Sequence, residues 1–123
     1  MFVHLNTHSI YSPMRGLLSL PEMMDLAKSC SMDTVALTDV NGLWGFIRFV
    51  QHCRSSRINP IAGVNLITNK QEVLILVENQ YGYENLCRII SSMHDEPNGD
   101  IPDILRKYHS GVFVLSYNIS TLK

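Results

Sequence analysis

Two residues that can bind a metal or transfer a proton follow apolar runs of the chain. His8 comes shortly after Phe2–Leu5, and Asp39 directly follows Thr34–Thr38. Both runs are rich in residues that suit buried strands. In parallel α/β folds, functional side chains gather just past the carboxyl ends of strands. We therefore expect His8 and Asp39 to lie at one rim of the fold, as metal ligands or as an acid–base pair.

Each of these residues also has a purely structural interpretation. A histidine in such a loop often only hydrogen-bonds the backbone, and Asp39 can form a turn or cap the helix that follows it. Two ligands are also fewer than the three or more protein groups that zinc, manganese and iron sites normally have. His4 points to the same side of its predicted strand as Asn6, but we expect it to be a packed strand residue.

Short apolar runs alternate with amphipathic runs along the chain, and this order predicts an α/β fold with a mostly parallel sheet. The predicted strands are Phe2–Leu5, Thr34–Thr38, Pro60–Ile67, Val73–Val77 and Val112–Leu115. The predicted helices are Ser19–Cys30, Trp44–Cys53, Tyr83–Met93 and, as a short fourth one, Ile101–Tyr108. Ser19 and Glu22 form the pattern of a capping box at the first helix. The last two predicted strands are almost entirely apolar, which is typical of strands covered on both faces.

Composition limits the class of protein. The 123 residues are 46% hydrophobic and 17% charged, which is too apolar for a disordered segment. A formal charge of −1 argues against binding nucleic acid by phosphate neutralisation alone. The three cysteines are widely spaced and predict free thiols in a reducing compartment. With no signal peptide and no apolar stretch of ~18 residues, we expect one soluble, cytoplasmic domain over residues 1–123 and no membrane contact.

Five blocks of the chain together form a recognisable sequence pattern. The first is FVHLNTHSIYS at residues 2–12. TVALTDVNGLWGF at 34–46 and INPIAGVNL at 58–66 follow it, and then VLILVENQYGYENLCRIIS at 73–91 and HSGVFVLS at 109–116. In this order and spacing, the blocks resemble the polymerase and histidinol phosphatase (PHP) domain, in the form found at the N-terminus of bacterial DNA polymerase III alpha subunits. The resemblance covers nearly the whole chain.

The resemblance implies a distorted, TIM-like βα barrel with a cluster of divalent metals, commonly zinc, manganese or iron, at its carboxyl rim. Active members hydrolyse phosphoesters, and in some polymerases the domain is a proofreading exonuclease; the metals polarise the phosphate and generate hydroxide. This chain retains the family's ligands at His8 and Asp39, and Glu72 stands where a histidine is expected. The other ligand positions are occupied by Asn6, Arg15, Val40, Asn65 and Asn118.

These replacements weaken the expected metal site. Asn65 and Asn118 are poor neutral ligands, Val40 offers no ligand atom, and Arg15 brings positive charge towards the cations. Losing several ligands should lower the affinity for metal by more than the ~10–100-fold that follows replacement of a residue that hydrogen-bonds a ligand. We therefore expect a catalytically inactive domain with no cofactor, or at most a vestigial zinc, manganese or iron site.

A complete barrel takes roughly 200 or more residues, so this chain is expected to form a partial, N-terminal portion of a barrel with about five strands. Unpaired strand edges then have to be covered, and we expect self-association, most simply a dimer. The resemblance implies a structural role beside polymerase or exonuclease subunits of a replication complex, with weak or indirect DNA contact. The alternative is a weak metal-dependent phosphoesterase or exonuclease that uses His8, Asp39 and Glu72, with Ser9 or Tyr11 nearby.

Overall fold

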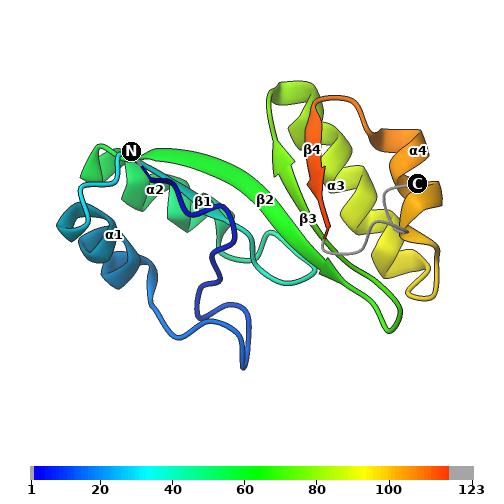
Figure 1. Cartoon of the computed structure of the whole chain (residues 1–123), viewed down its shortest axis with the longest axis horizontal. Helices are drawn as coiled ribbons and strands as arrows, with labels where there is room; N and C mark the ends of the chain where they lie inside the picture. Colours follow the sequence, from blue (N-terminus) through cyan, green and yellow to red (C-terminus); the bar gives the residue numbers. More distant parts are fainter. Residues whose placement is uncertain (1, 117–123) are drawn as a thin grey trace.

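Two groups of elements are joined by one long strand in the computed structural model, which describes residues 2–116 (Figure 1). The strands are β1 (Thr34–Leu37), β2 (Asn59–Ile67), β3 (Glu72–Val77) and β4 (Val112–Leu115). The helices are α1 (Leu20–Ser29), α2 (Phe46–Ser56), α3 (Gln80–Asp95) and α4 (Ile101–Tyr108). All four predicted helices are confirmed, as are four of the five predicted strands, with small differences at their ends.

The sheet has the order β1-β2-β3-β4 and is mixed, so the prediction of a mostly parallel sheet is wrong. β1 and β2 are parallel, whereas β2 with β3 and β3 with β4 are antiparallel. Only residues 68–71 separate β2 from β3, and a parallel connection needs about a dozen residues or more. In this turn Thr68 N–H donates to the Gln71 carbonyl oxygen at 2.8 Å, and Gln71 N–H donates to Thr68 Oγ1 at 3.0 Å.

The predicted first strand, Phe2–Leu5, is not a strand in the structure. This segment does run beside β1, because Ala36 N–H donates to the His4 carbonyl at 3.3 Å and Thr38 N–H donates to the Thr7 carbonyl at 2.8 Å. The two bonds are therefore two residues apart on one side, from Ala36 to Thr38, and three residues apart on the other, from His4 to Thr7, which breaks the regular pairing that a ladder requires. His4 is exposed, so its predicted role as a packed strand residue is also wrong.

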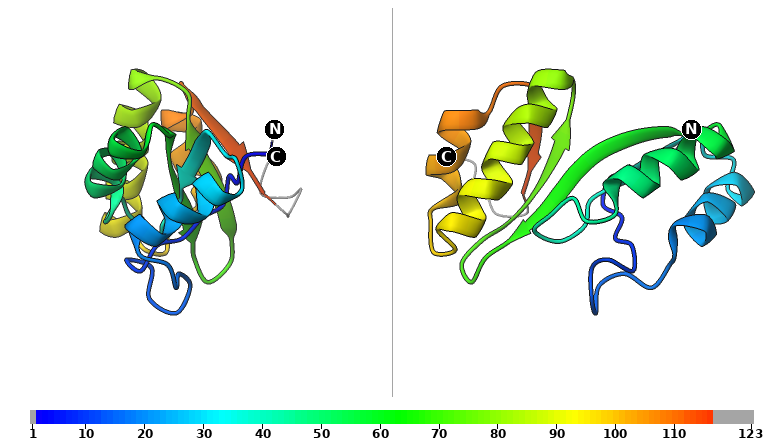
Figure 2. Two further views of the ribbon diagram at one scale, coloured as in Figure 1. Left: turned by 90° about the vertical axis from the view of Figure 1, so that its left-hand side faces the viewer. Right: turned by 180° about the vertical axis from the view of Figure 1, so that it is seen from behind.

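Each group of elements has its own hydrophobic core. The N-terminal group comprises β1, α1 and α2, and the C-terminal group comprises β3, β4, α3 and α4. The first core contains Leu20, Met23, Met24, Ala27, Val35, Leu37, Phe49, Cys53 and Ile58. The second contains Val64, Leu66, Val73, Ile75, Leu86, Ile89, Met93 and Ile101. Seen from behind in Figure 2, α3 lies across β3 and β4, and α2 lies beside the first half of β2.

The last strand is covered on one face only. Val112 and Val114 pack against the second core, whereas Phe113 and Leu115 are 57% and 44% exposed. The prediction that this strand is covered on both faces is therefore wrong for the described part of the chain. No described helix is long and apolar enough to cross a membrane.

Candidate functional site

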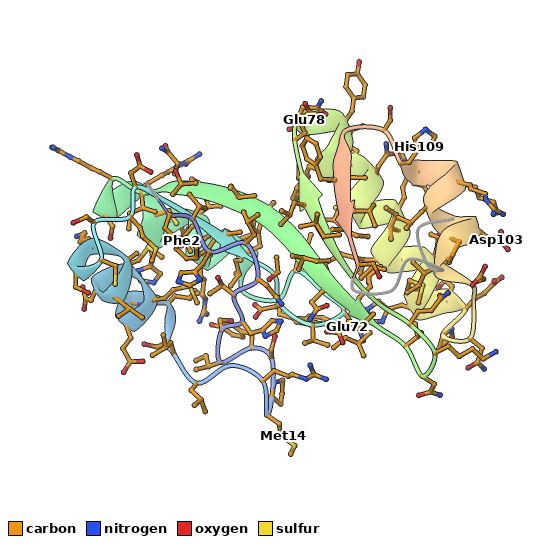
Figure 3. All side chains as sticks on the ribbon, viewed as in Figure 1. Phe2, Met14, Glu72, Glu78, Asp103 and His109 are labelled. Carbon is orange, nitrogen blue, oxygen red and sulfur yellow. The ribbon has the colours of Figure 1, made fainter. Side chains whose placement is uncertain are left out.

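The ends of three strands meet where the two groups of elements join. Because β3 runs antiparallel to β2, its first residue, Glu72, lies opposite Ile67 near the end of β2. Val40, three residues beyond the end of β1, pairs with Asn65 in an isolated parallel bridge. The residues that follow β1, the last part of β2 and the start of β3 thus lie together, and Figure 3 shows Glu72 at this junction. This confirms that the candidate positions at these strand ends converge.

The side-chain amide of Asn65 stands at the centre of this junction. Its Nδ2 lies 3.1 Å from Glu72 Oε1 and 3.2 Å from His8 Nε2. An ionised carboxylate can only accept, so the group of Asn65 that faces Glu72 is its NH₂, which has a second hydrogen to donate to His8. His8 Nε2 therefore accepts this bond, and the neutral imidazole carries its proton on Nδ1.

Electrostatics at the junction favour the neutral form of His8. Burial lowers the pKa of His8, and this effect outweighs the opposing influence of Asp39; Arg15 lowers the pKa further and Glu72 raises it. Arg15 Nη1 lies 4.0 Å from Glu72 Oε1, and the two side chains are about half exposed. The Arg15–Glu72 pair therefore contributes little stability by itself, but it places positive charge where the family pattern expects a metal.

Asp39 lies next to this network and is held by other partners. It is 1% exposed and accepts from Ser9 N–H at 2.8 Å, from Ser9 O–H at 2.9 Å and from Ser12 O–H at 2.8 Å. Ser12 Oγ in turn accepts from Val40 N–H at 2.9 Å. Asp39 therefore ties residues 6–16, which we call the His8 loop, to the end of β1. It does not cap the next helix, whose N-cap is Gly45.

The His8 loop is closely folded around these contacts. A Cβ atom on Gly16 would lie 1.9 Å from the Ser9 carbonyl oxygen, so a larger residue at this position would displace the backbone. Ser12 was not identified from the sequence as part of the site, and Ser9 was considered only as a neighbour of the metal. The signal that was available is the spacing of the two serines, three residues apart and directly after His8.

Asn6 occupies the edge of the site. Its Oδ1 accepts from Thr38 O–H at 3.2 Å, and Thr38 Oγ1 accepts from Thr7 N–H at 2.9 Å. Asn6 also lines a pocket of about 270 Å³. The other residues of this pocket are Leu5, Asn65, Glu72, Leu74, Leu115 and Ser116. Asn118, the remaining candidate position, lies outside the described residues.

The donors and acceptors at the junction do not fit a divalent cation. Within residues 2–116, no three His, Cys, Asp or Glu side chains gather closely enough to hold one. His8 and Glu72 do face a common point, but that point is the NH₂ group of Asn65, and the Arg15 guanidinium lies 4.0 Å from Glu72 Oε1. A metal ion requires acceptor atoms on all sides, whereas these two groups present N–H hydrogens.

Comparison with known proteins gives consistent matches. The family model of the PHP domain matches residues 4–121. The DNA polymerase III alpha subunit of Borreliella burgdorferi is 31% identical over 98% of this chain, and that of Bacillus subtilis is 30% identical over 94%. The chain spans only 12% and 11% of the length of these two relatives.

Two solved structures share the fold. An amidohydrolase from Chromobacterium violaceum superposes with a TM-score of 0.57 at 21% identity, covering 77% of this chain and 34% of its own. A putative metal-dependent phosphoesterase from Bifidobacterium adolescentis superposes with a TM-score of 0.53 at 12% identity, covering 87% of this chain and 49% of its own. At these identities the likeness concerns the fold alone.

Proposed function

Because this chain belongs to the PHP domain family, we propose that it acts in DNA replication as a non-catalytic domain related to the N-terminal part of DNA polymerase III alpha subunits. Its role is structural: it packs against polymerase or exonuclease partners in the cytoplasm, and it touches DNA weakly or indirectly. In this proposal residues 1–123 form one domain, a partial βα barrel. The similarity to two polymerase subunits over nearly the whole chain supports the replication context.

The absence of catalysis is inferred from one observation. The NH₂ group of Asn65 lies within hydrogen-bond distance of two potential ligand atoms of the described residues, His8 Nε2 and Glu72 Oε1. Asp39 directs both of its oxygens to serine hydroxyls and a backbone N–H. In this proposal His8, Asp39 and Glu72 are vestigial ligands, and Asn6, Arg15, Val40, Asn65 and Asn118 are degenerate positions.

Metal analysis tests this proposal. The protein, purified without chelator and assayed with a generic phosphodiester, is expected to contain far less than one zinc, manganese or iron per chain and to show no hydrolysis. The second candidate is a weak metal-dependent phosphoesterase, the activity for which the Bifidobacterium adolescentis protein of the same fold is named. Stoichiometric metal and hydrolysis that are both lost in His8→Ala would establish that candidate and overturn the first.

Self-association is the second part of the proposal. β4 is the last strand of the described sheet, and the outward side chains of this strand, Phe113 and Leu115, are apolar and partly exposed. Pairing of this edge with a second copy would give partners to backbone N–H and C=O groups that no described strand pairs. Light scattering at micromolar concentration is expected to show a dimer, and Phe113→Asp is expected to shift it to monomer. Met14→Asp, which changes an exposed apolar residue elsewhere, is the matched control; a monomeric wild type contradicts the proposal.

A further inference from the structure

Three segments of the chain meet at the Asn65 side chain. His8 comes from the His8 loop, Asn65 from β2 and Glu72 from the start of β3. The first segment belongs with the N-terminal group and the β2–β3 hairpin leads into the C-terminal group (Figure 1). An imidazole nitrogen and a carboxylate oxygen that face a single point from two segments form the arrangement that usually surrounds a cation. Here the point is an amide nitrogen, 3.2 Å and 3.1 Å from these two atoms.

We propose that the Asn65 amide, together with the Arg15 guanidinium, takes the structural place of a metal ion and cross-links the His8 loop to the β2–β3 hairpin. The amide supplies direction, because its two hydrogens reach His8 and Glu72. The guanidinium, 4.0 Å from Glu72 Oε1, supplies the positive charge. This inference rests on the proposed function in one respect, namely that the domain holds no metal.

Burial supports the assignment. Asn65 is 1% exposed, so its hydrogen bonds form where water competes weakly. Its Oδ1 is buried without a hydrogen-bond partner among the described residues. The orientation of the side chain is therefore set by the two bonds that Nδ2 donates. An unpaired buried acceptor is costly, and the donated bonds have to compensate for it.

The substitution Asn65→Asp distinguishes a cross-link made by the amide from one made by a bound metal ion. It preserves the size of the side chain but replaces the NH₂ group by an oxygen. In EDTA, the new carboxylate faces Glu72 without a hydrogen between them, and we expect a clearly lower melting temperature than that of the wild type. With zinc, three acceptor side chains converge on one point, so zinc is expected to raise the melting temperature of the variant by several degrees. The wild type is expected to respond to neither EDTA nor zinc.

Asn69→Asp is the matched control, because it makes the same change of charge at an exposed position of the β2–β3 turn. It should differ little from the wild type in EDTA and should not respond to zinc. If Asn65→Asp does not fold in EDTA, folding on addition of zinc is the expected result.

Three outcomes overturn the cross-link: Asn65→Asp is as stable as the wild type in EDTA, it melts at the same temperature with and without zinc, or it stays unfolded in both. In each of these cases a metal-free wild type leaves the proposed function standing. Stoichiometric zinc in the wild type, with a melting temperature that falls in EDTA, overturns both the cross-link and the proposed function.

Discussion

Replacing Asp39 tests how strongly the His8 loop is held to the sheet. The carboxylate accepts from three donors, the N–H and O–H of Ser9 and the O–H of Ser12, at 2.8–2.9 Å. A hydrogen bond to a charged group contributes about 1.5–3 kcal/mol. In Asp39→Ala the two hydroxyls can find partial replacements, so we expect the free energy of unfolding to fall by about 3–5 kcal/mol. That is a large part of the roughly 5–15 kcal/mol by which domains are usually stable.

The conservative change Asp39→Asn refines this prediction. It keeps one oxygen for Ser9 N–H and Ser12 O–H, and it offers an N–H that the Ser9 hydroxyl can accept. The expected loss is about 1–2 kcal/mol, because only the charge is removed from the interaction. The order of stability should therefore be wild type, Asp39→Asn, Asp39→Ala.

Urea unfolding followed by circular dichroism, with EDTA present throughout, measures these differences. Asp25→Ala is the control, since it removes a carboxylate from the exposed face of α1. It should change the free energy of unfolding by less than about 0.5 kcal/mol. A loss below about 1 kcal/mol for Asp39→Ala would refute the structural role of the buried carboxylate. In a parallel series with zinc in place of EDTA, a loss that appears only with the metal would show that Asp39 is a ligand.

Three further predictions concern other parts of the chain. Gly16→Ala would bring a Cβ atom within 1.9 Å of the Ser9 carbonyl oxygen, so the loop must shift and the urea midpoint should drop by the equivalent of about 1–3 kcal/mol; an unchanged midpoint contradicts the close approach. Burial raises the pKa of the Cys53 thiol to about 11, so a thiol reagent at pH 8 should label the exposed Cys30 and leave Cys53 unmodified until the protein is unfolded, as peptide mass spectrometry can show. Hydrogen bonds from Ser19 hold the pKa of Glu22 below 4.5, so the stability from this capping box is present above pH 4.5 and is lost as the pH falls through the folded pKa. The wild type should have a higher free energy of unfolding in urea than Glu22→Gln, and this difference should shrink over that pH range. A difference that stays constant would contradict the stabilising role of the Glu22 carboxylate.

Local patterns were sufficient for most of the elements. The capping box at Ser19 and Glu22 was predicted and is present, because it depends only on residues within one turn of a helix. The Ile101–Tyr108 helix and the Val112–Leu115 strand have the predicted bounds. The segment Phe2–Leu5 was predicted as a strand from its composition, but regular pairing depends on β1, a distant part of the chain. The strand propensity of a segment cannot show that its pairing with another segment shifts by one residue partway along.

At the candidate site, too, the residue types could be predicted from the sequence but the contacts between distant residues could not. The sequence identified His8, Asp39, Asn65, Glu72 and Arg15 as the positions to examine, through their place after strands and through the family pattern. It also showed by residue type that several ligands are replaced. It did not show that the Asp39 carboxylate accepts hydrogen bonds from Ser9 and Ser12, because these residues are 30 and 27 positions away from Asp39 in the sequence.

The sequence by itself determined the family, the helices and the loss of ligand types, because these follow from residue identity and short-range spacing. The tertiary structure decided that β3 runs antiparallel to β2, and this direction brings Glu72 to the same rim as His8 and Asn65. It also decided that the Asn65 amide stands between these two acceptors. Which donor meets which acceptor depends on the relative placement of segments that are up to 57 residues apart, and only the packing of the folded chain sets that placement.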